Sequence, residues 1–137
     1  MAYQKKLSNS MRCPFEYALQ IFGGKWKSRI LCLLHNTGAL RFHRISAEMD
    51  NISDGVLSAA LQELQTAGVV SRAVYAEVPP RVEYALTERG ESLIPVLRSI
   101  CLWAQTERDF SADSLLLPCQ QCRYMRSGER AEEEKER

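Results

Sequence analysis

Residues 53–87 have the sequence SDGVLSAALQELQTAGVVSRAVYAEVPPRVEYALT, and this stretch decides the fold. Its first half predicts a helix, because Ser53 is a favourable N-cap residue and apolar side chains recur at helical spacing as far as Ala67-Gly68. The apolar face of this helix comprises Val56, Leu57, Ala60, Leu61 and Leu64. The opposite face has only small or polar residues, which leaves it available for contact with another molecule. These residues are Asp54, Gly55, Ser58, Ala59, Gln62 and Gln65.

The second half of the stretch predicts a β-hairpin. Residues 69–75 alternate well enough for a strand, and residues 82–86 form the return strand. Between them, Glu77-Val78-Pro79-Pro80 cannot continue a strand, because proline has no backbone N–H to donate. We therefore expect two antiparallel strands joined by a proline-rich tip.

Helices are also predicted on both sides of this stretch. Before it, apolar residues at helical spacing favour helices over residues 14–22, about 25–35 and 42–49, each followed by turn-forming residues. After it, Thr87 is a natural N-cap residue for a closing helix. The apolar stripe of that helix comprises Leu93, Val96, Leu97, Ile100, Trp103 and Ala104. The expected fold is mainly α with a small β-hairpin.

This order of elements is typical of a winged helix-turn-helix, in which the second helix of the pair enters the DNA major groove and the hairpin is the wing. Base recognition would then fall on Ser58 and Gln62, with Ser53 as a cap or a phosphate contact. Basic residues lie where phosphate contacts would be useful, although the alternative is that they are ordinary surface charges. These residues are Lys25, Lys27, Arg29, Arg41, His43, Arg44, Arg72 and Arg81.

Length and charge limit the class of protein. The 137 residues fit one compact core, and 18 basic against 17 acidic side chains give no bulk attraction to nucleic acid or membrane. The polar start and the lack of any stretch long enough to span a bilayer lead us to expect a cytoplasmic protein. We expect a DNA-binding and dimerisation domain over 12–110, a C-terminal extension over 111–126 and a charged, disordered tail over 127–137.

Several strings resemble the HxlR-type family of bacterial winged-helix regulators, which are similar to MarR-type proteins. They include CPFEY at 13–17, FGGKWK at 22–27 and EVPPRVEYALT at 77–87, and the resemblance covers about residues 12–107. It implies a dimeric, sequence-specific DNA-binding repressor or activator whose first and last helices supply the dimer contacts. Family members generally have longer polar or basic side chains where this chain has Asp54, Gly55 and Ala59. This departure leaves a second interpretation open, a winged-helix protein-interaction module with weak or lost DNA binding.

Three cysteines are candidates for redox chemistry. The resemblance implies that Cys13 acts as a thiol redox sensor, and a helix N-terminus beside Arg12 favours the reactive thiolate. The alternative is a small buried residue at the dimer interface. Cys119 and Cys122 form a CxxC pair, which either closes as a disulfide or supplies half of a zinc site completed by the dimer mate. A four-thiolate site would need a second such pair, so we expect no metal.

The remaining chemistry indicates that the protein is not an enzyme. His35 and His43 are its two histidines, and the sequence has neither a glycine-rich phosphate loop nor a Ser-His-Asp arrangement at usable spacing. Cys32 and Cys101 fall among apolar helix positions, where a cysteine packs as a small hydrophobic residue. We expect double-stranded DNA as the partner, no cofactor, and a small molecule or an oxidant as the effector.

Overall fold

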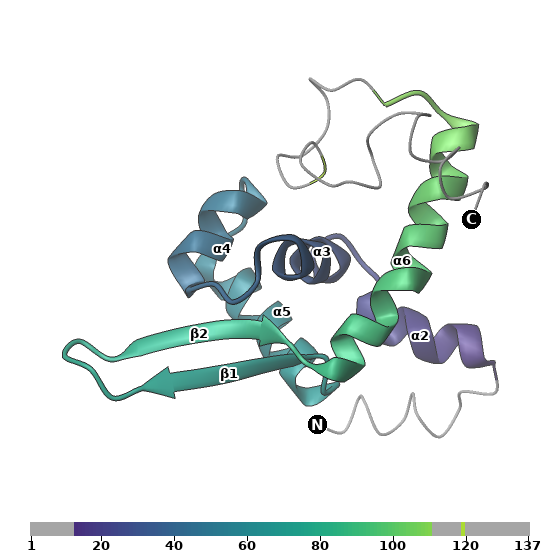
Figure 1. The fold of residues 1–137 in the computed structure, drawn as a ribbon. Helices are drawn as coiled ribbons and strands as arrows, with labels where there is room; N and C mark the ends of the chain where they lie inside the picture. The colour runs from purple at the N-terminus through teal and green to yellow at the C-terminus, as the bar shows by residue number, and fades with distance from the viewer. Residues whose placement is uncertain (1–12, 111–118, 120–137) are drawn as a thin grey trace, which may run out of the picture.

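The computed structural model describes residues 13–110 and Cys119, and this part of the chain is mainly helical with a two-stranded antiparallel sheet. In Figure 1, α3 lies at the centre, α4 lies to its left, α5 lies below it behind the hairpin, and α6 and α2 lie to its right. The predicted fold class is confirmed. The elements in chain order are α2 (Pro14–Phe22), α3 (Lys27–Thr37), α4 (Phe42–Met49), α5 (Asp54–Thr66), β1 (Val70–Tyr75), β2 (Arg81–Leu86) and α6 (Glu88–Glu107).

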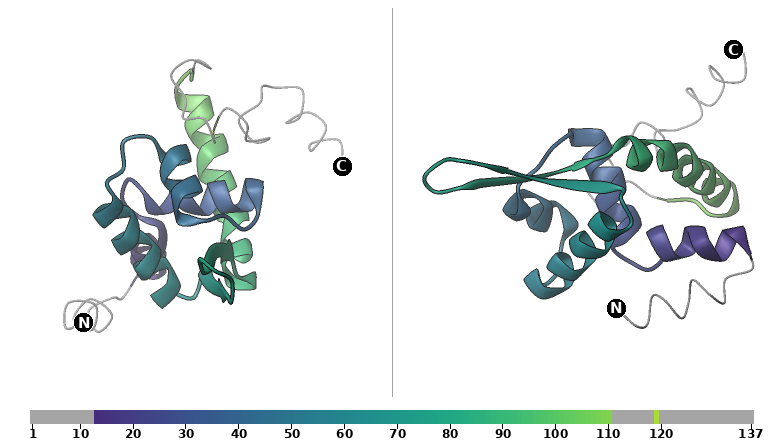
Figure 2. Two further views of the ribbon diagram at one scale, coloured as in Figure 1. Left: turned by 90° about the vertical axis from the view of Figure 1, so that its left-hand side faces the viewer. Right: turned by 90° about the horizontal axis from the view of Figure 1, so that it is seen from below.

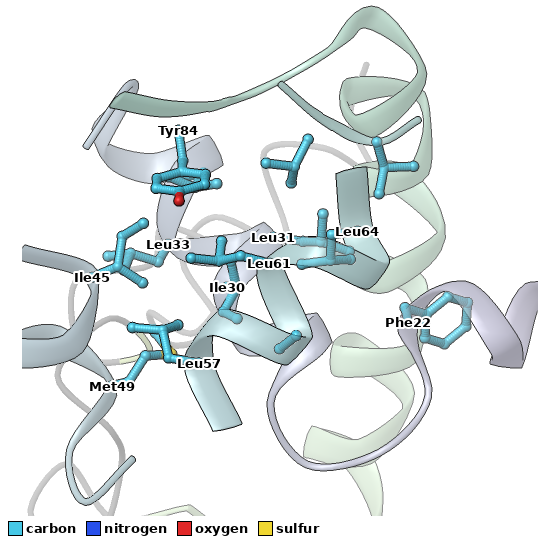
Figure 3. Close-up of a cluster of buried hydrophobic side chains, with 14 of the residues drawn as sticks. Phe22, Ile30, Leu31, Leu33, Ile45, Met49, Leu57, Leu61, Leu64 and Tyr84 are labelled. Carbon is cyan, nitrogen blue, oxygen red and sulfur yellow. The ribbon is translucent and has the colours of Figure 1, made fainter. Parts of the chain in front are cut away.

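Helix α3 is the centre of the hydrophobic core. Apolar side chains from α4, α5 and β2 pack around it, and burial of this surface away from water is the main source of stability. Because the apolar face of α5 is turned toward α3, its opposite face lies outward. The core residues labelled in Figure 3 are Phe22, Ile30, Leu31, Leu33, Ile45, Met49, Leu57, Leu61, Leu64 and Tyr84.

A tight turn joins α4 to α5. Asp50 and Asn51 both have left-handed backbone conformations, with φ of 53° and 61°, which reverse the chain between the two helices. Ser53 then caps α5, because its side-chain oxygen accepts a hydrogen bond of 3.2 Å from the backbone N–H of Val56. The predicted N-cap is confirmed, and it fixes the first turn of α5.

The hairpin is attached to the body through β2. Val70 pairs with Leu86 and Tyr75 pairs with Arg81, so the return strand begins at Arg81, one residue before the predicted start. Leu40, in the loop between α3 and α4, exchanges two backbone hydrogen bonds of 2.9 and 2.8 Å with Tyr84. The base of the hairpin is therefore fixed against the helices, and its tip projects away from them (Figure 2).

Three sequence expectations about the helices were wrong in detail. Helix α3 begins at Lys27 rather than about Lys25, because Trp26 occupies the N-cap position. Val56 belongs to the predicted apolar face of α5, yet 44% of it is exposed, because the core reaches only the row formed by Leu57, Ala60, Leu61 and Leu64.

The third correction concerns α6. Only part of its predicted apolar stripe is buried, because a single narrow row of α6 residues packs into the core. Ile94 and Leu97 are buried in the core, whereas Val96, Ile100 and Trp103 of the predicted stripe are exposed. Thr87 caps the helix as predicted, accepting a 3.1 Å hydrogen bond from the N–H of Gly90. Of the helices described, none is both long and apolar enough to cross a membrane.

Candidate nucleic-acid interface

The outward face of α5 is the candidate recognition surface. The residues predicted for this face are exposed, except Gln65, which is half-buried and donates a 3.2 Å hydrogen bond to the carbonyl of Leu61. Val56 and Glu63 flank the face and are also exposed. Helix α5 contains no lysine or arginine, so its outward face has no long basic side chain. The exposed members are Asp54, Gly55, Ser58, Ala59 and Gln62.

Three of the predicted phosphate contacts are exposed arginines. Arg41 precedes α4 as its N-cap residue, and Arg72 lies in β1. Arg44 is one turn into α4 and lies 3.5 Å from the carboxylate of Glu48, with most of its side chain still in solvent. A surface pair of this kind contributes little to stability, so Arg44 can exchange this partner for a phosphate at small cost.

Three other predicted contacts surround the start of α3. The ammonium of Lys25 lies 4.6 Å from the centre of the Trp26 ring, and the guanidinium of Arg29 lies 5.1 Å from it. Lys27 is only 20% exposed in its side chain, and its Nζ lies 2.7 Å from Glu63 Oε2 of α5. Lys27 Nζ also donates a 3.1 Å hydrogen bond to the carbonyl of Gln20 in α2. Lys27 thus joins three helices, a contact that no pattern in the sequence indicates.

Arg81 is similarly engaged within the hairpin. Its guanidinium lies 4.1 Å from the centre of the Tyr75 ring, the residue opposite it in the β-ladder. Two carboxylates, those of Glu77 and Glu83, lie 3.5 and 3.6 Å from its nitrogens. Because two acidic groups already balance its charge, Arg81 is poorly suited to attract a phosphate.

Four cysteines lie in the part of the chain that the structure describes. Cys13 is exposed at the N-cap position of α2, where its side chain makes no capping hydrogen bond. Cys32 and Cys101 are half-buried and line one small pocket between α3 and α6. Cys119 is half-buried, and Cys122 lies outside the described residues. Within residues 13–110 and Cys119, no three side chains of the metal-binding types are grouped so that they could hold a metal ion.

A second group of exposed apolar side chains lies on α2 and α6. These helices lie at the end of the molecule away from the hairpin tip (Figure 1 and Figure 2), and Arg89 of α6 donates a hydrogen bond of 2.5 Å to the hydroxyl of Tyr17 of α2. We call the exposed apolar side chains of these two helices the α2–α6 face. Large apolar side chains in water favour contact with another molecule. Its exposed apolar residues are Phe15, Tyr17, Leu19, Val96, Ile100, Leu102 and Trp103.

Helices α4 and α5, joined by a tight turn and followed by a β-hairpin, have the arrangement that defines winged helix-turn-helix proteins. Residues 21–111 match the HxlR-like helix-turn-helix family. An uncharacterised HTH-type transcriptional regulator of Methanothermobacter thermautotrophicus is 47% identical over 93 residues, which are 68% of this chain and 70% of that protein. The chain therefore belongs to the HxlR-like family and is a helix-turn-helix transcriptional regulator.

Solved structures agree with this assignment. The redox regulator HypR in its oxidised form is 37% identical, with a TM-score of 0.61 over 72% of this chain and 100% of that one. The reduced form of the transcriptional regulator YodB from Bacillus subtilis is 34% identical, with a TM-score of 0.65 over 72% of this chain and 97% of that one. These relatives favour a DNA-binding regulator over a protein-interaction module.

Proposed function

We propose that this protein is a cytoplasmic homodimer that binds a near-palindromic DNA site and places one α5 helix in the major groove of each half-site. The observation that carries this proposal is the outward face of α5, which is held by the Ser53 cap and the tight turn after α4. In a helix-turn-helix dimer, half-sites lie about one helical turn, roughly 34 Å, or a multiple of it apart.

Within this proposal, the contacts divide into three groups. Ser58 and Gln62 contact bases, because their side chains are exposed on α5 and carry hydrogen-bonding groups. Exposed lysine and arginine side chains contact phosphates. The Ser53 hydroxyl caps α5. Lys27 and Arg81 hold helices and hairpin in position. The phosphate-contacting cations are Lys25, Arg41, Arg44 and Arg72.

The proposed dimer uses the α2–α6 face. Val96, Ile100 and Trp103 are exposed on α6 although their spacing is that of a buried stripe. A second copy of the same surface would remove them from water, and closed two-fold dimers are the commonest symmetric assembly. Two linked recognition helices also match the two-fold symmetry of a palindromic site.

The basic test of this function is binding to duplex DNA from the region upstream of the protein's own gene. Fluorescence anisotropy at two salt concentrations, with and without excess unrelated DNA, separates specific from general binding. We expect specific binding that weakens steeply as salt rises, because phosphate neutralisation releases counterions. Equal competition by unrelated DNA across several upstream fragments would count against sequence-specific regulation.

Arg72 and Arg81 should respond differently to alanine substitution. Arg72→Ala should lower the slope of log affinity against log salt by about 2, because the homodimer loses one phosphate contact in each half-site. Arg81→Ala should weaken binding by loosening the hairpin but leave that slope unchanged, because its charge is already balanced by Glu77 and Glu83. Salt titrations of both variants against wild type make the comparison. An equal fall in slope for the two would return Arg81 to the phosphate contacts.

We also propose that oxidation of Cys13 controls DNA binding. Cys13 is exposed at the start of α2, so a change there would alter the helix that supplies half of the α2–α6 face. Hydrogen peroxide would oxidise the Cys13 thiol to a sulfenic acid and release water. The similarity to HypR, which is described as a redox regulator, supports an oxidant as the signal here.

Cys13→Ser should therefore remove the effect of peroxide on DNA affinity while leaving the affinity of the reduced protein unchanged. Cys32→Ser is the matched control, because Cys32 is half-buried on α3, and this variant should keep the peroxide response. Anisotropy before and after peroxide treatment measures both. A peroxide response that persists in Cys13→Ser would assign the sensing to another group.

A further inference from the structure

We propose that α5 recognises thymine methyl groups and adenine, so that the bases it contacts in each half-site are A·T pairs. The inference rests on the proposed function and adds the chemical class of the DNA site. Three features of α5 carry it: the absence of long basic side chains, the exposure of Val56, and the spacing of Gly55, Ala59 and Gln62.

The first feature removes the commonest contact to guanine. Guanine presents two acceptors, N7 and O6, in the major groove, and arginine or lysine usually donates to both. Helix α5 contains neither residue. Its acidic Glu63, which could accept from cytosine, lies 2.7 Å from Lys27 Nζ and is held by that pair. Asp54 is the one other acidic residue of the helix, so a contact to the amino group of cytosine would depend on that residue alone.

The second feature is a valine that the core does not explain. Val56 lies in the first turn of α5, where the recognition helix of such a fold comes closest to base edges, and 44% of it is exposed. Its backbone N–H is bonded to Ser53, and a β-branched side chain in a helix has essentially one rotamer. Binding would therefore cost Val56 little conformational entropy. Thymine alone among the bases presents a methyl group in the major groove, and apolar side chains recognise it.

The third feature is the small size of the side chains at the centre of the outward face of α5. Gly55 and Ala59 are one helical turn apart, and the space around Gly55 is open to 4 Å from where a Cβ would lie. With no long side chain there, the helix backbone can approach the base edges closely, which brings the methyl groups of Ala59 and Val56 within reach. Gln62 follows Ala59 by three residues on the same exposed face, and glutamine pairs with adenine N6 and N7.

The test begins with selection of bound duplexes from a random-sequence library by the full-length protein. We expect enriched half-sites whose central contacted pairs are A·T. The thymines of the enriched half-site are then replaced with deoxyuridine, which keeps the same pairing and lacks only the 5-methyl group. Wild-type affinity should fall by about fourfold for each methyl group that is contacted, the value of one buried methylene.

Val56→Ala should show a smaller ratio of thymine to deoxyuridine affinity than the wild type, because it removes two methyl groups of the contact at residue 56 and leaves the contact of Ala59. Arg72→Ala is the matched control, since it should weaken binding to both duplexes and preserve the wild-type ratio between them. Equal affinity of the wild type for the two duplexes, or enrichment of G·C pairs at the contacted positions, would overturn the inference while leaving the proposed function in place. A library without any enriched sequence would overturn the proposed function, and the inference with it.

Discussion

Gly90→Ala is expected to lower the free energy of unfolding by about 2 kcal/mol, as an overpacked core position does. Gly90 lies in the first turn of α6, and a Cβ there would lie 2.2 Å from the carbonyl oxygen of Val69. That oxygen cannot move aside, because it accepts a 3.1 Å backbone hydrogen bond from Thr87. The helix would have to shift away from the start of the hairpin, and the midpoint of thermal unfolding should fall by about 10 °C.

The sign of this effect distinguishes tertiary packing from helix propensity. Alanine is favoured over glycine inside a helix by about 1 kcal/mol, so propensity alone predicts that Gly90→Ala stabilises the protein. Gly55→Ala is the matched control, because it is also a helical glycine and its added Cβ would meet nothing within 4 Å. We expect Gly55→Ala to raise the free energy of unfolding by about 0.5 kcal/mol. Chemical denaturation of both variants at one protein concentration measures the difference, and a stabilised Gly90→Ala would contradict the packing argument.

Trp103→Glu is expected to convert the proposed dimer to monomers and to weaken DNA binding by a factor of about 10² to 10⁴. Trp103 is 66% exposed on α6, so the chain's own core does not require it. Aromatic side chains of this kind are frequent centres of interface energy, and an unpaired carboxylate in their place is costly to desolvate. The loss of DNA affinity follows because each monomer would bind one half-site without the help of a linked partner.

Sedimentation analysis over a range of protein concentrations measures the first effect, and anisotropy with a two-half-site duplex measures the second. Val78→Glu is the control for oligomeric state, because Val78 is fully exposed at the hairpin tip and lies outside the α2–α6 face. It should remain dimeric. A Trp103→Glu protein that still sediments as a dimer would show that the dimer forms through another surface.

Local patterns in the sequence were sufficient for the order and nature of the elements. Ser53 and Thr87 were identifiable as helix caps, because an N-cap needs only a side-chain oxygen and a following helical run. The hairpin was predictable from two alternating segments around Pro79 and Pro80, and its strands differ from prediction by one residue at each start. These features depend on contacts between near neighbours in the chain, which a single sequence contains.

Part of the candidate site was predictable for the same reason. The exposed face of α5 follows from helical spacing, so the sequence alone predicts that Ser58 and Gln62 lie on the surface that we propose contacts bases. Lys27 and Arg81 were assigned to phosphate because they are basic and lie at element ends. Within the chain, Lys27 pairs with Glu63 of α5 and Arg81 lies over Tyr75 of β1, and both partners come from elements that folding or strand pairing brings together.

Local patterns along the chain are enough to predict which segments are helical, where the hairpin turns, and that the chain has a winged helix-turn-helix and the motifs of its family. Packing in the folded protein selects which apolar residues the core buries. Periodicity defines a face of a helix, but the width of the buried row depends on the helix that packs against it. For that reason Val56 and Trp103 are exposed and remain available to DNA and to a second copy, while Gly90 is required by a carbonyl oxygen 21 residues earlier in the chain.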